Sequence, residues 1–329
     1  MTSRRLFCKA ITAIGVGSLL FAASSAEAQR DYPHKPIALV VTFAAGGGTD
    51  VVARIAAKHL SKELGQPVNV VNKPGGNSIP GAMSVMTSAP DGYTLLFDSP
   101  ATSSLHTLAS DLPYKVDQRT WGPLVASGPY IYAVNAKSPW KTLKDVAEAG
   151  KRDPSSIEIG WLGGKSFTDT TMLKFLSVAG IDVSKVKKVP FAGAGPAVIA
   201  LAGGHINFTG GNIGSATSLI ASGDVRALAV SGDQRAAILP DVPSSVEAGI
   251  PVPLTGWNAI SGPAGMSPKI IQRLDEAAKK IVKDPDYIKE LSAVGNVATY
   301  KAPSEMPAYV SSEVKILREV EASLATAKK

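Results

Sequence analysis

The sequence predicts an α/β fold of two lobes with largely parallel sheets and a ligand cleft between the lobes. The chain has 329 residues, which is more than one ordinary domain usually holds. Short β-branched runs alternate with amphipathic helical runs along most of the chain, as is typical of α/β folds. Glycine-rich turns at 43–50 and 73–81 each follow a predicted strand and lead into a helix. Because ligands of such folds bind at the carboxyl ends of strands, these two turns are the first candidates for a site.

Residues 1–28 are predicted to be an export signal rather than part of the fold. The segment begins with three basic residues, Arg4, Arg5 and Lys9. An apolar stretch at 10–23 follows, and an A-x-A motif that ends at Ala28 places the mature start at Gln29. Ser3–Lys9 also resembles a twin-arginine signal, so the Sec and the twin-arginine routes both stay open. Either route leads to the periplasm. The alternative for this segment is a buried N-terminal helix.

Composition excludes several kinds of site in the mature protein. Cys8 is the single cysteine and lies in the signal, so the mature chain can form no disulfide, thiolate metal site or cysteine nucleophile. Loss of three basic residues and one acidic residue with the signal lowers the formal charge from +7 to +5. The remaining lysines and arginines are scattered, and we therefore expect no nucleic-acid partner.

Three strands are expected in the first lobe, at 37–43, 68–72 and 93–97. After the first of them, a run of three glycines at 46–48 precedes a helix whose apolar residues fall on one face. Backbone N–H groups at such a helix start attract an anion. Asp50 is a cap for this helix or a contact to the ligand, and it can be both.

The second lobe is expected to begin near residue 127. Its predicted strands and helices alternate: strands at 130–134, 157–160, 187–191, 206–209 and 227–230, helices at 142–149, 168–179 and 196–202. The Pro/Gly-rich stretch 240–256 is expected to cross back, and a final amphipathic helix from Met306 to Leu324 to pack against the first lobe. We therefore expect lobe 1 to comprise 29–127 plus 257–329, and lobe 2 to comprise 128–256.

Motifs for nucleotide binding and catalysis are missing from the sequence. No Gly-Lys-Ser/Thr follows the glycine run, and Val51 stands where a dinucleotide fingerprint needs its third glycine. No Gly-x-Ser-x-Gly elbow occurs, and the four histidines show no metal-binding spacing. We therefore expect no catalytic residue, no metal and no cofactor. A receptor fits these observations better than an enzyme. An exported α/β hydrolase stays an alternative that would need a nucleophile beside a base.

Several short motifs occur in order along the mature chain: Tyr32–Ile37, Phe43–Asp50, Asn72–Gly75, Ala89–Leu96, Leu112–Tyr114, Leu201–Ile206, Arg226–Val230, Leu239–Gly249 and Gly262–Gly265. With these motifs the chain closely resembles the periplasmic solute-binding receptors of tripartite tricarboxylate transporters, the Bug-type family. The resemblance implies a periplasmic-binding-protein (Venus-flytrap) fold whose lobes close on a small, usually carboxylated ligand. It implies capture by backbone groups and ordered waters more than by arginine, and membrane transporter subunits as partners. We expect a monomer.

The resemblance also implies the ligand contacts. On lobe 1 they are Phe43, Ala45, Gly48, Thr49, Asp50, Asn77 and Ser78. Ser99 and Thr102, just past the strand at 93–97, are further candidates on that side. On lobe 2 the contacts are Trp161, Gly163, Lys165, Ser166, Phe167, Thr168, Ala192, Gly193, Gly211 and Asn212.

Three departures from the family pattern bear on the ligand. Trp161 stands in a segment where the family often has small hydroxyl residues, Phe167 replaces a small residue or proline, and Gly211 replaces a frequent Asp. Without that Asp an α-amino group lacks a partner, so an aromatic or long-chain carboxylate is favoured over aspartate or citrate. Packing in the core is the alternative role for Trp161. The function predicted is capture of a small carboxylate, of aromatic or dicarboxylic type, for a tripartite tricarboxylate-type importer. Alternatives are a receptor of another importer class and a periplasmic sensor partner of a membrane kinase.

Overall fold

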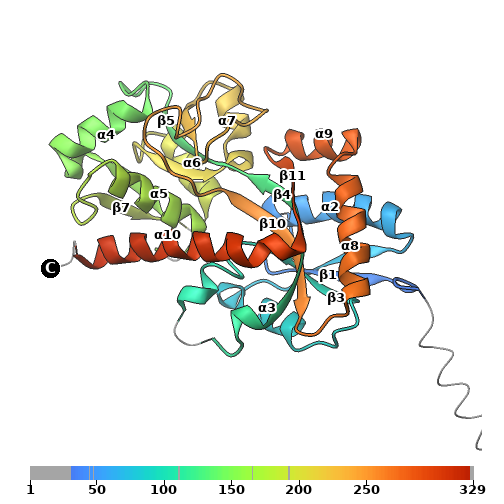
Figure 1. The fold of residues 1–329 in the computed structure, drawn as a ribbon. Coiled ribbons are helices and arrows are strands. Elements are labelled where there is room, and N and C mark those ends of the chain that lie inside the picture. The colour runs from blue at the N-terminus through green and yellow to red at the C-terminus, as the bar shows by residue number, and fades with distance from the viewer. Residues whose placement is uncertain are drawn as a thin grey trace, which may run out of the picture.

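The computed structural model describes residues 31–43, 45–46, 48–109, 112–164, 166–191 and 193–326, and these form two α/β lobes (Figure 1). The predicted export signal lies outside the described residues. One lobe contains a six-stranded sheet and the other contains a three-stranded and a two-stranded sheet. The two lobes are connected by strands that pass from one to the other and by the last helix.

The six-stranded sheet has the order β11-β4-β10-β3-β1-β2. Its strands are β1 (Ile37–Val41), β2 (Val68–Asn72), β3 (Thr94–Asp98), β4 (Arg119–Gly128), β10 (Gly256–Pro263) and β11 (Val297–Lys301). β1 pairs in parallel with β2 and β3, whereas β10 pairs antiparallel with β3 and β4, and β11 antiparallel with β4. The expectation of largely parallel sheets is therefore wrong for this half of the sheet. The reason is that β4 leaves this lobe and β10 returns to it, so the two run in opposite directions.

The two sheets of the second lobe are built from five short strands. They are β5 (Tyr130–Asn135), β6 (Glu158–Trp161), β7 (Lys187–Pro190), β8 (Thr209–Asn212) and β9 (Val225–Val230). The three-stranded part has the order β8-β5-β9 and is antiparallel, while β6 and β7 are parallel. A bridge between Ile159 and Phe208 connects the two parts. The segment 240–256, expected to cross back, contains no helix or strand before β10 begins.

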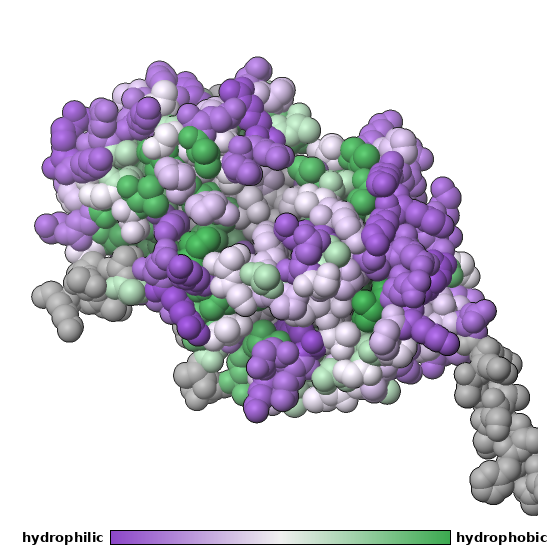
Figure 2. All heavy atoms as spheres, in the orientation of Figure 1, coloured by the Kyte–Doolittle hydropathy of each residue, from purple (hydrophilic) through white to green (hydrophobic). Residues whose placement is uncertain are grey.

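Helices cover both faces of each sheet. In the first lobe they are α2 (Gly48–Leu64), α3 (Ile79–Met86), α8 (Pro268–Ile281) and α9 (Pro285–Ala293). In the second they are α4 (Leu143–Arg152), α5 (Phe167–Val178), α6 (Ala194–Ala202) and α7 (Thr217–Ala221). Short 3-10 turns occur at Gly76–Ser78, His106–Leu108, Val116–Gln118, Pro154–Ser156, Ile213–Ser215 and Pro303–Glu305. The outer face of α8 is mainly hydrophilic (Figure 2), as expected for an amphipathic helix whose other face is buried. Among the described residues, no helix combines the length and apolarity needed to cross a bilayer.

The chain passes between the lobes where β4 runs into β5 and where β10 begins. Gly128 pairs with Gly256 at this point. A Cβ on Gly256 would lie 3.0 Å from the carbonyl oxygen of Gly128, and a Cβ on Gly128 would lie 2.4 Å from Oδ1 of Asn296. The connecting strands are therefore in close contact at Gly256, and the missing side chain of Gly128 leaves room for Asn296.

The last helix, α10 (Met306–Thr326), lies along both lobes (Figure 1). Its first half packs against the first lobe, where Met306, Val310 and Val314 share a core cluster with strands β4 and β10. Leu317 and Val320, in its second half, belong to the core of the second lobe. The final helix thus contacts both lobes, which differs from the expected packing against the first lobe alone.

Candidate functional site

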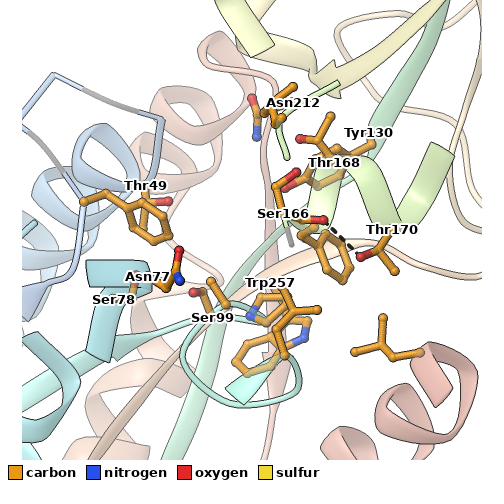
Figure 3. A pocket seen from close by; sticks show the side chains of 18 of the residues that line it. Thr49, Asn77, Ser78, Ser99, Tyr130, Ser166, Thr168, Thr170, Asn212 and Trp257 are labelled. Carbon is orange, nitrogen blue, oxygen red and sulfur yellow. Dashed lines mark hydrogen bonds between the residues drawn. The ribbon is translucent and has the colours of Figure 1, made fainter. Parts of the chain in front are cut away.

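A cavity of about 760 Å³ lies between the lobes and is lined by residues of both. Figure 3 shows Thr49, Asn77, Ser78 and Ser99 on one side of it and Tyr130, Ser166, Thr168 and Asn212 on the other. This size falls within the usual range for pockets that hold small molecules. The cavity is therefore the candidate ligand site.

Four helices begin at this cavity. Gly48 and Thr49 open α2, Ser78 directly precedes α3, Thr168 lies in the first turn of α5, and Ala194 opens α6; all of them line the cavity. The first N–H groups of a helix have no carbonyl partner within it, and the helix dipole places positive potential there. Among the described lining residues none is a lysine or an arginine. Within the described lining, attraction for an anion therefore comes from backbone and neutral polar groups.

Asp50 holds the loop that precedes α2. It is buried and accepts hydrogen bonds from the Gly46 N–H (2.8 Å), from Arg54 Nε (2.9 Å) and from Asn72 Nδ2 (2.8 Å). Burial alone would raise the pKa of Asp50, but the hydrogen bonds from Arg54, Gly46 and Asn72 outweigh it and the pKa is lowered. Asp50 is the third residue of the helix and not its cap. It does not line the cavity, because its carboxylate points to these three partners.

Asp169 holds the corresponding loop of the second lobe. It is the third residue of α5 and fully buried, and its carboxylate accepts the N–H groups of Leu162 (2.9 Å) and Gly164 (2.8 Å) and the hydroxyl of Ser166 (2.9 Å). Ser166 in turn caps α5, since its Oγ accepts from the Asp169 N–H at 3.0 Å. The lining residues Leu162, Gly164 and Ser166 are thus positioned by one carboxylate.

Trp257 and Tyr130, on the connecting strands, line the cavity where the lobes meet. Trp257 Nε1 donates to both oxygens of Glu313 at 3.2 Å, and the hydroxyl of Ser104 also donates to that carboxylate. Burial raises the pKa of Glu313 to about 7, although the bonds from Ser104 and Trp257 oppose the rise. Burial, with the nearby Glu313, raises the pKa of Tyr130 to about 12, so this phenol keeps its proton at neutral pH.

His106 is the lining histidine among the described residues. Its Nε2 lies 2.7 Å from the carbonyl oxygen of Asn77, and its Nδ1 bonds to the Tyr114 hydroxyl. Both ring nitrogens are therefore engaged with groups other than a serine. The nucleophile–base pair that a hydrolase would need is not formed by this histidine.

Many of the residues expected at the site do line the cavity. They are Phe43, Gly48, Thr49, Asn77, Ser78, Ser99, Ser166, Phe167, Thr168 and Asn212. Lys165 and Ala192 lie outside the described residues.

Three of the expected contacts on lobe 1 are not in the lining. Ala45 is an exposed residue of the loop before α2, and Asp50 faces its hydrogen-bond partners. Thr102 is fully buried, where its hydroxyl accepts the Ser99 N–H at 3.0 Å and donates to Asp98. Thr102 therefore fixes the backbone of the lining residue Ser99, and Asp50 fixes the loop before α2.

Four expected contacts on lobe 2 are not in the lining either. Trp161 packs against the core of that lobe and the backbone of Gly164, with the Lys188 ammonium 5.7 Å from its ring centre. Gly211 faces Ser215, whose Oγ would lie 2.9 Å from an added Cβ. Gly163 and Gly193 lie in the loops next to lining residues. Core packing, the alternative considered for Trp161, is the role seen here.

Sequence reasoning missed the lining residues that come from the connecting strands and the last helix. The connecting strands supply Gly128, Tyr130, Gly256, Trp257 and Asn258, and the last helix supplies Leu317, Val320 and Glu321. Asn296, which directly precedes β11, was missed as well. Gly295 indicates the end of a helix, but nothing local in the sequence indicates that the next residue, Asn296, lines the cavity. The α10 residues carry the ordinary spacing of a packed helix, and nothing local distinguishes them from core.

Comparisons with known proteins agree with this architecture. The family model described as "Tripartite tricarboxylate transporter family receptor" matches residues 52–320. Protein BugT of Bordetella pertussis is 31% identical over 304 residues, which cover 89% of this chain and 91% of BugT. The solved periplasmic binding protein BugD has a TM-score of 0.73 at 26% identity, over 89% of this chain and 98% of that one. MatC from Rhodopseudomonas palustris with bound malate has a TM-score of 0.73 at 27% identity, over 88% and 99%. The expected periplasmic-binding-protein fold is confirmed.

Proposed function

Because the chain belongs to the tripartite tricarboxylate transporter family of receptors, we propose that it captures a small carboxylate between its two lobes. The observation that carries this proposal is the meeting of four helix N-termini at one cavity whose described lining has no lysine or arginine. The described part of such a site favours negative charge through backbone donors and helix dipoles. MatC, a relative of known structure, holds malate, which is a dicarboxylate.

The proposal includes where and with what the receptor works. The signal at 1–28 directs the chain to the periplasm and is removed after Ala28. Lobe 1 (29–127 plus 257–329) and lobe 2 (128–256) close on the ligand. The receptor works as a monomer. The closed form is then recognised by membrane subunits of a tripartite transporter, because closure changes the surface that both lobes present together. Copurification of these subunits only with ligand-loaded receptor is the expected result; capture of a membrane kinase instead would favour the sensor role.

Calorimetric titration tests the carboxylate itself. The mature protein is unfolded in urea, dialysed and refolded to remove copurified ligand, and then titrated with benzoate, succinate and hexanoate and with the matching neutral amides. We expect at least one acid to bind and its amide to bind at least about tenfold more weakly, because the loss of one charge-assisted hydrogen bond costs about 1.5–3 kcal/mol. Equal affinity of acid and amide would contradict an anion site.

A pair of variants locates the charge at the helix start. Thr49→Glu places a second negative charge at the N-terminus of α2, inside the cavity, and should abolish acid binding. Thr87→Glu makes the same change at an exposed position outside the cavity and should bind like the parent protein. Acid binding that survives Thr49→Glu would place the anion elsewhere.

A further inference from the structure

The cavity has two chemically different ends. One end is formed by the helix starts and the polar side chains described above. The other lies where the 3-10 turn at 106–108, helix α5 and helix α10 come together. Five leucine and valine side chains line this second end, which we call the apolar annex: Leu105, Leu108, Leu173, Leu317 and Val320.

The annex is continuous with the hydrophobic core of the second lobe. Leu173, Leu317 and Val320 are members of that core cluster, and Leu105 and Leu108 pack against it although they belong to the first lobe. Trp257 adds an indole whose N–H is already bound by Glu313. Leu105 and Leu108 are half-buried and present accessible hydrocarbon surface, which an apolar ligand group can cover with a gain in free energy. Leu173, Leu317, Val320 and Trp257 are almost fully buried and form the apolar wall behind that surface.

The charge at the annex has the opposite sign to the charge at the helix starts. Glu321, an exposed residue near the end of α10, lines the cavity and is the acidic residue of the described lining. A second carboxylate on the ligand would be repelled by Glu321. The described lining contains no lysine or arginine that would offset this repulsion.

We propose that the annex holds the apolar body of an amphipathic monocarboxylate, a hydrocarbon chain or an aromatic ring, whose single carboxylate lies at the helix starts. This inference rests on the proposed function and specifies its ligand. A cavity of about 760 Å³ has room for such a body beyond the carboxylate. A dicarboxylate of equal length places charge against Glu321 and is disfavoured.

A chain-length series tests the proposal. Linear monocarboxylates of four to ten carbons and the α,ω-dicarboxylates of equal length are titrated by calorimetry into ligand-free protein. We expect the affinity of the monocarboxylates to rise about fourfold per methylene until the annex is filled, which corresponds to about 0.8 kcal/mol per buried CH₂. The dicarboxylates should bind at least about tenfold more weakly than monocarboxylates of the same length.

Two variants assign the effects to the annex. Leu108→Asn, at a half-buried position, should flatten the dependence on chain length and leave butanoate binding unchanged. Glu321→Lys should raise the affinity for dicarboxylates at least tenfold and leave monocarboxylates within about threefold. Glu148→Lys, on the exposed face of α4 away from the cavity, is the matched control and should change neither.

The outcomes separate this inference from the proposed function. If acids bind better than their amides but affinity is flat with chain length, or dicarboxylates bind more tightly, the annex proposal is overturned and carboxylate capture stands. If no acid binds better than its amide, the proposed function itself fails. If Leu108→Asn lowers the affinity for butanoate and decanoate alike, the chain does not lie in the annex.

Discussion

The imidazole of His106 holds the backbone carbonyl of Asn77, with Nε2 2.7 Å from the oxygen. A carbonyl can only accept, so Nε2 carries the proton and Nδ1 accepts from the Tyr114 hydroxyl. Burial lowers the pKa of His106, and the nearby Arg119 lowers it further, so the ring is neutral at pH 7. Asn77 and Ser78 have φ values of 52° and 67°, a left-handed conformation that is unfavourable for residues other than glycine. The histidine from one loop therefore stabilises a strained turn of another.

His106→Phe should weaken ligand binding without unfolding the protein. The phenyl ring fills the space but cannot donate to Asn77, so the turn that presents Asn77 and Ser78 to the cavity relaxes. We expect about a tenfold loss of affinity, as for one buried hydrogen bond. His106→Gln keeps an N–H donor and should recover part of the loss. Calorimetry gives the affinities, and circular dichroism checks the fold. Equal binding by the phenylalanine and glutamine variants would show that the hydrogen bond does not matter.

Glu313 should make stability fall as pH rises between about 4.5 and 7. Burial raises its pKa in the folded state to about 7 from the ordinary 4.5. Across this window the unfolded carboxyl loses its proton while the folded one keeps it, so the folded state binds more protons and is destabilised by increasing pH. The full effect, present above pH 7, is on the order of 3 kcal/mol.

Glu313→Gln removes this titration and preserves the shape of the side chain. Its amide oxygen can accept from Trp257, and its amide nitrogen can donate to Ser104. We expect the variant to match the parent in urea unfolding at pH 4.5 and to exceed it at pH 8. A parent protein whose stability does not decrease from pH 5 to pH 7 relative to the variant would contradict the raised pKa.

The buried pair Asp98–Arg119 should be costly to break. Both side chains are fully buried, and Asp98 also accepts from Ser261 Oγ at 2.6 Å and from the Ser99 N–H at 2.9 Å. Arg119→Met leaves the carboxylate without its cation, and we expect a loss of about 3–5 kcal/mol in the free energy of unfolding. Adding Asp98→Asn should restore part of it, because the second variant no longer buries a charge. Urea denaturation of the two variants and of Asp98→Asn alone measures the coupling.

Several strands and one loop could be predicted from short stretches of the sequence. The strand at 68–72 was predicted with the observed bounds, and the one at 130–134 within one residue of its observed end. The loop at 43–50 was recognised because a run of glycines before an amphipathic helix is a short-range signal. Strand β4 was not predicted, because it contains Gly122 and Pro123, which normally interrupt strands. The structure places these two residues where the pairing of β4 with β10 shifts register, so a bulge accommodates them.

The part of the site where residues far apart in the chain come together had no comparable signal in the sequence. Leu317 and Phe167 are 150 positions apart in the chain, and their approach depends on how α10 crosses from one lobe to the other. Trp161 was expected at the cavity because the family resemblance implies a ligand contact at its position. Its ring instead packs on Gly164, whose backbone leaves room for it. The direction in which β6 ends determines whether the Trp161 side chain faces the cavity or the core, and the residue type alone does not predict that direction.

Asp50 and Asp169 occupy equivalent places in the two lobes, and we expect equivalent effects from removing them. Each is the third residue of a helix that begins at the cavity. Asp50 accepts one N–H of the loop before its helix, and Asp169 accepts two. Asp169→Asn keeps the volume but offers one acceptor oxygen in place of two, so one of its two loop N–H groups, or the Ser166 hydroxyl, loses its partner. Because this site is fully buried, the variant should lose about 1–3 kcal/mol of stability.

Ligand binding distinguishes a local effect of the Asp169 variant from general destabilisation. Leu162, Gly164 and Ser166 line the cavity, so loosening of their backbone should lower acid affinity at temperatures well below the unfolding transition. Asp145→Asn, at an exposed capping position of α4 outside the cavity, is the matched control: it removes a similar hydrogen-bond set but should leave affinity unchanged. If Asp169→Asn lowers the unfolding temperature and yet binds the acid as tightly as the parent, this carboxylate stabilises the lobe without shaping the site.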